Sequence, residues 1–191
     1  MASDAGMEAL TAPRDLARAR AALAAAGYRG ERVVLFSPSD FPNLKALADV
    51  GADLLRKVGF AVDYQATDWS TMLQRLASTE PVEGGGWSMF HTYWSGLDQM
   101  NPGVHAFLRG NGRAAPSRGA PVSPRLEALR EGWLAAEEPD QPRIAAEMQR
   151  VAFEDLPYLP LGQILPRTAF RREITDVLTG YAIFWNLRRA A

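Results

Sequence analysis

The sequence lacks cysteine, contains only two lysines, and has no long apolar run. The absence of cysteine excludes a disulfide framework, a Cys-ligated metal centre and a thiol nucleophile. No stretch approaches the roughly 18–20 consecutive apolar residues that a membrane-spanning helix needs. Residues 1–8 show neither a basic segment nor an apolar segment, so we expect no signal peptide in this chain.

An excess of one charge is also missing. The 21 basic and 22 acidic side chains leave a formal net charge of −1, so there is no global field to attract nucleic acid, and we expect no such partner. Hydrophobic residues make up 47% of the 191 positions, which suffices for a sizeable core. We expect residues 1–12 to be a disordered lead-in and residues 13–191 to form a single lobe.

The first half of the chain alternates between helical and strand patterns. The apolar spacing predicts helices at 13–26, 43–58 and 69–78, and strands at 33–36, 60–64 and 87–93. We expect Ser39 or Asp40 to cap the second helix and Asp68 to cap the third. Strands that alternate with helices favour an α/β fold with a mostly parallel sheet flanked by helices.

The second half begins with a long segment, 94–122, that is rich in glycine and proline. A loop of this length is unusual in a compact domain and is typically functional. The following patterns predict helices at 123–136 and 140–155, then strands at 158–165 and 181–187. Trp133 and Trp185 occupy apolar periodic positions, so we expect both in the core.

Motifs for catalysis or for a cofactor are absent. The sequence has no phosphate-binding glycine loop and no Gly-x-Ser-x-Gly elbow, so we expect no cofactor. A metal site built from His91, His105 and Asp98 is conceivable, but their spacing does not favour it and we expect no metal. The alternative function is a small cytoplasmic α/β hydrolase that uses a serine with His91 and Asp98.

The segment Tyr93–Pro102 carries the most informative side chains. It follows the third expected strand, and ligands bind beyond the carboxyl ends of the strands in open α/β sheets. Trp94 offers a large apolar face, and Asp98 offers a charge that could meet a ligand ammonium group. We expect Tyr93, Trp94, Asp98 and Asn101 to bind ligand. The alternative is that Trp94 packs in the core and Asp98 forms a local turn.

Several short segments also resemble a known family in their order and spacing. They are Leu23–Tyr28, Val33–Phe36, Ala52–Phe60, Asp68–Trp69, Trp94–Pro102, Phe153–Leu161, Asp176–Tyr181 and Phe184–Asn186. Together they resemble the C-terminal lobe of bacterial extracellular solute-binding proteins of family 5, the peptide- and nickel-binding components of ABC importers. The resemblance extends from about residue 11 to residue 191.

The resemblance implies one lobe of a periplasmic-binding-protein type II-like fold and no enzymatic activity. The parent would be a longer periplasmic protein whose missing N-terminal lobe closes over a small-molecule or peptide ligand. The closed form would deliver this ligand to an ABC permease in the membrane. Asp98 stands four residues before Pro102, where peptide-binding members pair an aspartate with the peptide α-ammonium group. A protein-interaction domain without a ligand is the third alternative.

Overall fold

The computed structural model describes residues 3–114, 119–180 and 183–190. The chain divides into two compact units, Met1–Tyr158 and Leu159–Ala191, where the sequence predicts a single lobe over 13–191. Within the described ranges, no helix combines the length and the apolar character that crossing a membrane requires.

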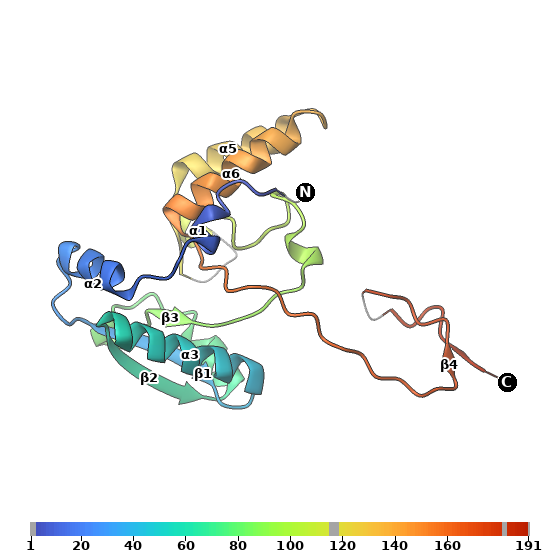
Figure 1. The fold of residues 1–191 in the computed structure, drawn as a ribbon, viewed down its shortest axis with the longest axis horizontal. Helices are drawn as coiled ribbons and strands as arrows, with labels where there is room; N and C mark the ends of the chain where they lie inside the picture. The colour runs from blue at the N-terminus through green and yellow to red at the C-terminus, as the bar shows by residue number, and fades with distance from the viewer. Residues whose placement is uncertain (1–2, 115–118, 181–182, 191) are drawn as a thin grey trace. The chain divides into compact units, whose positions relative to one another are not determined.

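The first unit contains a three-stranded parallel sheet with the order β2-β1-β3 (Figure 1). The strands are β1 (Arg32–Pro38), β2 (Ala61–Thr67) and β3 (Met89–Phe90). Val34, Leu35 and Phe36 of the central strand are fully buried, as their continuous apolar run predicts. The α/β class and the parallel sheet are therefore confirmed, although β3 is much shorter than the strand expected over 87–93.

Three helices precede or connect the strands of this sheet along the chain: α2 (Leu16–Ala25), α3 (Pro42–Val58) and α4 (Trp69–Arg75). Pro42 begins α3, and Gly59 ends it with a φ of +117° that favours glycine. Asp68 caps α4 by accepting a hydrogen bond from the Thr71 N–H at 2.9 Å, as predicted. The predicted cap of α3 is wrong, because Asp40 instead accepts a hydrogen bond from the backbone N–H of Trp69.

Helices pack on both faces of the sheet. Ala48 and Ala52 of α3 lie against Leu35, whereas Met72 of α4 joins Val34 and Phe36 in a second cluster. Fully burying a large apolar side chain contributes roughly 1.5–3 kcal/mol, so these two clusters are the main stabilisation of the sheet. The loop after β3 begins at the edge of this well-packed sheet.

The second part of the first unit is a helix pair, α5 (Pro124–Ala135) and α6 (Gln141–Asp155), which lie side by side (Figure 1). Leu126 and Trp133 of α5 pack on Met148 and Val151 of α6, so the predicted core position of Trp133 is confirmed.

The start of α5 is joined to the end of α6 by polar contacts. The Ser123 hydroxyl donates to Asp155 and accepts from the Leu126 N–H at 3.2 Å. The Arg125 guanidinium also donates to Asp155 and, together with Ser123, lowers the pKa of that carboxyl to about 2.

The N-terminal segment is folded against α6, which differs from the disordered lead-in expected over 1–12. Residues Glu8–Thr11 form the one-turn helix α1. The side-chain amide of Gln149 donates to the carbonyl oxygens of Ser3 and Ala5, at 3.0 and 2.7 Å. Pairing with two backbone carbonyls fixes a segment whose own sequence has no strong structural preference.

The second unit has a two-stranded antiparallel pairing of β4 (Ile174–Thr175) with β5 (Arg188–Arg189). The strand expected over 158–165 is wrong; this segment is irregular, and Pro160 has no N–H for a ladder. Of the strand expected over 181–187, residues 181–182 lie outside the described residues, and 183–187 form none.

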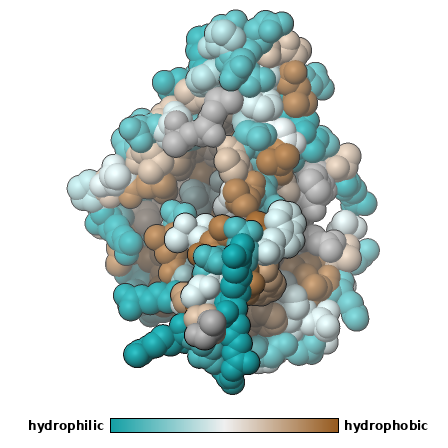
Figure 2. Space-filling view, turned by 90° about the vertical axis from the view of Figure 1, so that its right-hand side faces the viewer, coloured by the Kyte–Doolittle hydropathy of each residue, from teal (hydrophilic) through white to brown (hydrophobic). Residues whose placement is uncertain are grey.

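Apolar side chains of the second unit reach the surface. Trp185 is 88% exposed, so its predicted core position is wrong. No described residue of 159–190 is buried, which means that the unit encloses no core of its own. Figure 2 shows hydrophobic side chains at several places on the molecular face that it presents.

Candidate functional site

The segment after β3 places three of the four expected ligand-binding residues, Tyr93, Trp94 and Asp98, on the surface. Tyr93 is 52% and Trp94 53% exposed. The Trp94 indole meets Phe107 edge to face, with 5.5 Å between ring centroids and an interplanar angle of 83°. The alternative in which Trp94 packs in the core is therefore wrong. A half-exposed indole supported by a second ring provides an apolar contact surface for a ligand.

Asp98 lies on the 3-10 helix η2 (Leu97–Gln99), and its side chain is exposed. Its carboxylate has no ion-pair partner among the described residues. The turn that the alternative assigned to Asp98 is made by Asn101, whose Oδ1 accepts a hydrogen bond from the Gly103 N–H at 2.9 Å. Asp98 is thus a charge without a structural role in this loop, and the ligand roles of all four residues stay predictions.

Side chains of α5 fix this loop on the helix pair. Arg130 donates to the carbonyl oxygens of Pro102 and Gly103, at 3.2 and 3.0 Å. Glu127 accepts two hydrogen bonds from Arg109 and one from the Gly110 N–H. Although partial burial opposes it, these hydrogen bonds lower the pKa of Glu127. The sequence does not reveal these anchors, because an arginine or glutamate on a helix usually faces solvent.

Near Trp94, His105 pairs with Tyr158, a contact that the sequence does not predict. His105 and Tyr158 stack with 5.5 Å between ring centroids, and Tyr158 also contacts Phe107 at 5.9 Å. The His105 Nε2 and the Tyr158 hydroxyl are 3.3 Å apart. Burial lowers the pKa of His105 and raises that of Tyr158. The sequence shows only that Tyr158 stands between Pro157 and Pro160 after the end of a helix, which does not indicate a contact with His105.

His91 is buried, and the structure does not place it in a catalytic arrangement. It is 7% exposed, and its Nδ1 has no hydrogen-bond partner among the described residues. Its ring packs on Gly51 of α3, whereas Asp98 is exposed on η2. No hydrogen bond in the described part of the chain joins His91 to Asp98 or to a serine, which a hydrolytic triad requires. The hydrolase alternative therefore gains no support.

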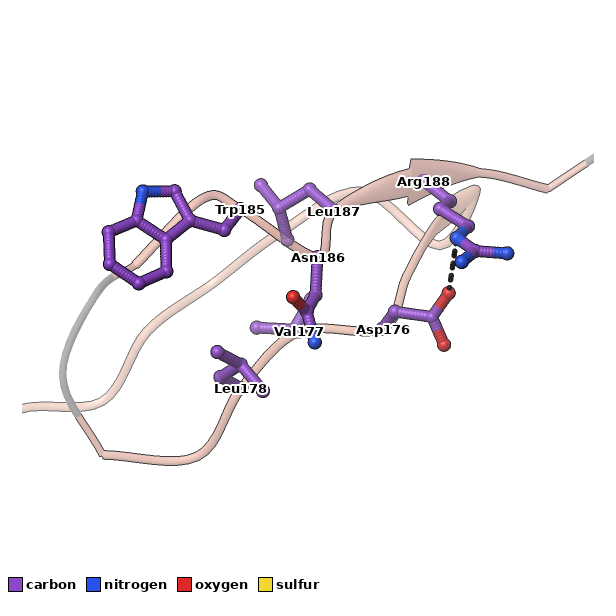
Figure 3. A pocket seen from close by; sticks show the side chains of 7 residues that line it. All are labelled: Asp176, Val177, Leu178, Trp185, Asn186, Leu187 and Arg188. Atoms are coloured by element: carbon purple, nitrogen blue, oxygen red, sulfur yellow. Dashed lines mark ion pairs between the residues drawn. The ribbon is translucent and has the colours of Figure 1, made fainter.

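Acidic and histidine side chains do not gather elsewhere in the described residues into a group of three that could hold a metal ion. The second unit has a hollow of about 520 Å³ between Asp176–Leu178 and Trp185–Arg188 (Figure 3). Its one guanidinium, from Arg188, is paired with Asp176 at 3.3 Å. None of the expected ligand-binding residues lines it, so the candidate site stays on the loop that follows β3.

The chain is similar in sequence to a known transport protein. No protein-family model matches the chain. The chain is 31% identical, over 167 residues, to the probable peptide ABC transporter periplasmic-binding protein y4tO of Sinorhizobium fredii. Over this span the chain is similar to that periplasmic-binding protein. The alignment covers 86% of this chain but only 31% of that relative, so the chain spans less than a third of the relative's length.

Solved structures of substrate-binding proteins share the fold. The protein CtaP of Listeria monocytogenes has a TM-score of 0.62 at 16% identity, covering 74% of this chain and 28% of its own. NikA of Staphylococcus aureus, solved with Ni(L-His)2, has a TM-score of 0.59 at 15% identity, covering 75% and 30%. At such identities the likeness establishes the fold alone, and it confirms the periplasmic-binding-protein type expected from the sequence.

Proposed function

We propose that this chain is a solute-binding lobe of an ABC importer and that it captures a peptide or an amino-acid derivative. The observation that carries the proposal is the Asp98 carboxylate, which has no ion-pair partner in the described part of the chain and lies on the same loop as the half-exposed Trp94 indole. This pair sits beyond a strand of a parallel sheet, where ligands of open α/β folds bind. The similarity to a peptide-type periplasmic-binding protein agrees with a ligand of this class.

The chemistry of the loop fits a ligand with a free amine. The ligand ammonium group pairs with Asp98, while its apolar part lies on Trp94 and Tyr93. The Asn101 amide nitrogen has no acceptor among the described residues and can donate to a ligand, while its Oδ1 is used in the local turn. When a second lobe excludes water, the ammonium–carboxylate pair strengthens, and ligands without an amine leave Asp98 buried and unpaired.

The parent protein in this proposal is periplasmic and two-lobed, with residues 13–191 forming its C-terminal lobe. The missing N-terminal lobe closes over the ligand by hinge motion, and the closed form docks on an ABC permease. Support comes from the name of the curated relative and from the 31% of its length that this chain spans. The apolar side chains exposed in the second unit are consistent with a covering partner outside this chain.

Native mass spectrometry, followed by denaturation, tests this proposal on the protein extended by its upstream lobe. We expect a released species that carries a free amine, because a buried charge pair retains such ligands through purification. A released sugar or metal chelate would contradict the peptide assignment and keep the importer function. Absence of bound species, together with no stabilisation by a peptide panel, would contradict solute binding itself.

A further inference from the structure

The hydrogen bonds of His105 define its tautomer. Its Nδ1 accepts a hydrogen bond from the backbone N–H of Leu108 at 3.1 Å, and this N–H also donates to the His105 carbonyl oxygen at 3.2 Å. A neutral imidazole has one accepting and one donating nitrogen, so the proton of His105 is on Nε2. This nitrogen is 3.3 Å from the Tyr158 hydroxyl. His105 therefore donates, and the Tyr158 oxygen accepts.

This direction leaves the Tyr158 hydroxyl proton without an acceptor among the described residues. A phenol can accept and donate at the same time, and the donated hydrogen bond of Tyr158 is unused. Tyr158 is half-buried, and a polar group in such a position is costly if it stays unsatisfied. Its ring contacts Phe107, which in turn supports Trp94. The free O–H group thus belongs to the aromatic cluster of the candidate site.

We propose that the Tyr158 hydroxyl is a ligand-binding group that donates to a carbonyl or carboxylate oxygen of the solute, and that His105 is a positioning residue that orients it. This inference rests on the proposed solute-binding function and narrows its ligand class. A solute that satisfies both Asp98 and Tyr158 carries an ammonium group and an acceptor oxygen, as peptides do. A simple alkyl amine satisfies Asp98 alone.

Two probes separate the roles of Tyr158 and Asp98 in the full chain. Trialanine carries an ammonium group and acceptor oxygens, whereas N-acetylalanine amide carries acceptor oxygens but no ammonium group. Each is titrated into the millimolar range while tyrosine ring carbons are followed by NMR. We expect Tyr158→Phe to weaken both probes about 3- to 10-fold, the effect of one neutral hydrogen bond. Asp98→Asn should weaken trialanine alone.

The outcomes distinguish this inference from the proposed function. Equal affinities of the wild type and Tyr158→Phe for both probes would overturn the role of Tyr158. So would the absence of any shift of the Tyr158 signal up to the solubility limit of the probes. If Tyr158→Phe weakens both probes and Asp98→Asn weakens neither, the Tyr158 contact is supported and the ammonium-binding proposal fails.

His105 is tested by two variants with different reach. In His105→Gln the amide nitrogen can replace Nε2 and still donate to Tyr158. In His105→Asn the shorter side chain can replace only Nδ1 and keeps the Leu108 contact. We expect His105→Gln to retain probe affinity and His105→Asn to lose it to the level of Tyr158→Phe. Equal affinity of the two variants, or an Nδ1–H tautomer in ¹⁵N spectra of His105, would overturn its positioning role.

Discussion

The contact between Gly51 and His91 leaves no room for a larger side chain. A Cβ added at Gly51 would lie 2.6 Å from both Cε1 and Nε2 of the His91 ring. We expect Gly51→Ala to destabilise the protein by about 1–3 kcal/mol, the usual range for overpacking. Urea unfolding followed by tryptophan fluorescence measures this change in the free energy of unfolding.

Gly132 is the matched control, because it also lies inside a helix but has no atom within 4 Å of an added Cβ. Gly132→Ala should stabilise the protein by about 0.5–1 kcal/mol, since alanine loses less backbone entropy in a helix. His91→Ala should remove most of the cost of Gly51→Ala. If Gly51→Ala were as stable as the wild type while His91 is still present, the close contact between Gly51 and His91 would be contradicted.

The two buried histidines predict how stability depends on pH. Burial lowers the pKa of His91 and of His105 below their ordinary value of 6.5. The unfolded chain therefore binds more protons near and below pH 6.5, and stability is full above this pH and falls as pH decreases. Asp155, with a pKa of about 2, stays ionised in this range.

The measurement is the urea midpoint at about pH 5 and about pH 7.5, compared with a chain carrying His91→Gln. We expect a lower midpoint at the acidic pH in the wild type and a smaller difference in the variant. An unchanged difference would show that His91 does not contribute to the acid sensitivity.

Asp98 is the residue on which ligand affinity should depend most in the two-lobed parent that we propose. We expect Asp98→Asn to weaken a ligand with a free amine by about 2–5 kcal/mol, the cost of leaving one partner of a buried charge pair alone. Calorimetry measures the dissociation constant. Glu138→Gln, an exposed acid in the connection between α5 and α6, is the control. Affinities that are equal in Asp98→Asn and wild type would remove Asp98 from the site.

Among the larger elements, α5 holds the loop that follows β3 through Arg130. Arg130→Met keeps the apolar stem but removes the donors to the Pro102 and Gly103 carbonyl oxygens. We expect hydrogen exchange in residues 94–106 to accelerate about 10-fold, since these bonds contribute on the order of 1–2 kcal/mol. Exchange in the central strand β1 should not change.

Arg143→Met on α6 is the control for this measurement, because Arg143 is exposed and, among the described residues, forms an ion pair only with Asp140, at 3.8 Å. Acceleration in the loop for both variants would show a general loss of stability. No acceleration for Arg130→Met would show that the loop keeps its shape without this anchor.

Apolar periodicity and capping residues predicted the helices and strands well where these patterns are strong. The buried run of β1 and the span of α3, with Pro42 at its start and Gly59 at its end, follow from apolar period and capping. The prediction failed at 158–165, where apolar residues alternate with Pro160 and Gly162. Their exposure in this chain means that no packing partner selects a strand.

The candidate site was predicted in part. Trp94 and Asp98 are exposed on the loop that follows the third strand. The sequence could indicate this position because ligands of open α/β sheets bind beyond the carboxyl ends of the strands. The pairing of His105 with Tyr158 spans 53 residues, and no periodic pattern connects positions so far apart. Such contacts depend on how the loop folds back on the helix pair, which a single sequence does not show.

For the molecule as a whole, stability should reside in the first unit. Every buried core residue of the described ranges lies between Val34 and Val151. We expect a chain that ends at Tyr158 to unfold within about 0.5 kcal/mol of the full chain, because the described part of the removed segment contributes no buried core residue. Urea unfolding of both chains tests this. A truncated chain that is clearly less stable would show that residues 159–191 contribute to the fold.

The anchoring of the ligand loop by Arg130, Glu127 and the His105–Leu108 hydrogen bond has a kinetic consequence. Ordering a loop of this length costs conformational entropy, and here that loss occurs during folding and not when the solute arrives. A preorganised surface binds with a smaller entropy penalty and needs no slow rearrangement before contact. Solute capture on this lobe should therefore be a single fast step, followed by a separate and slower closure.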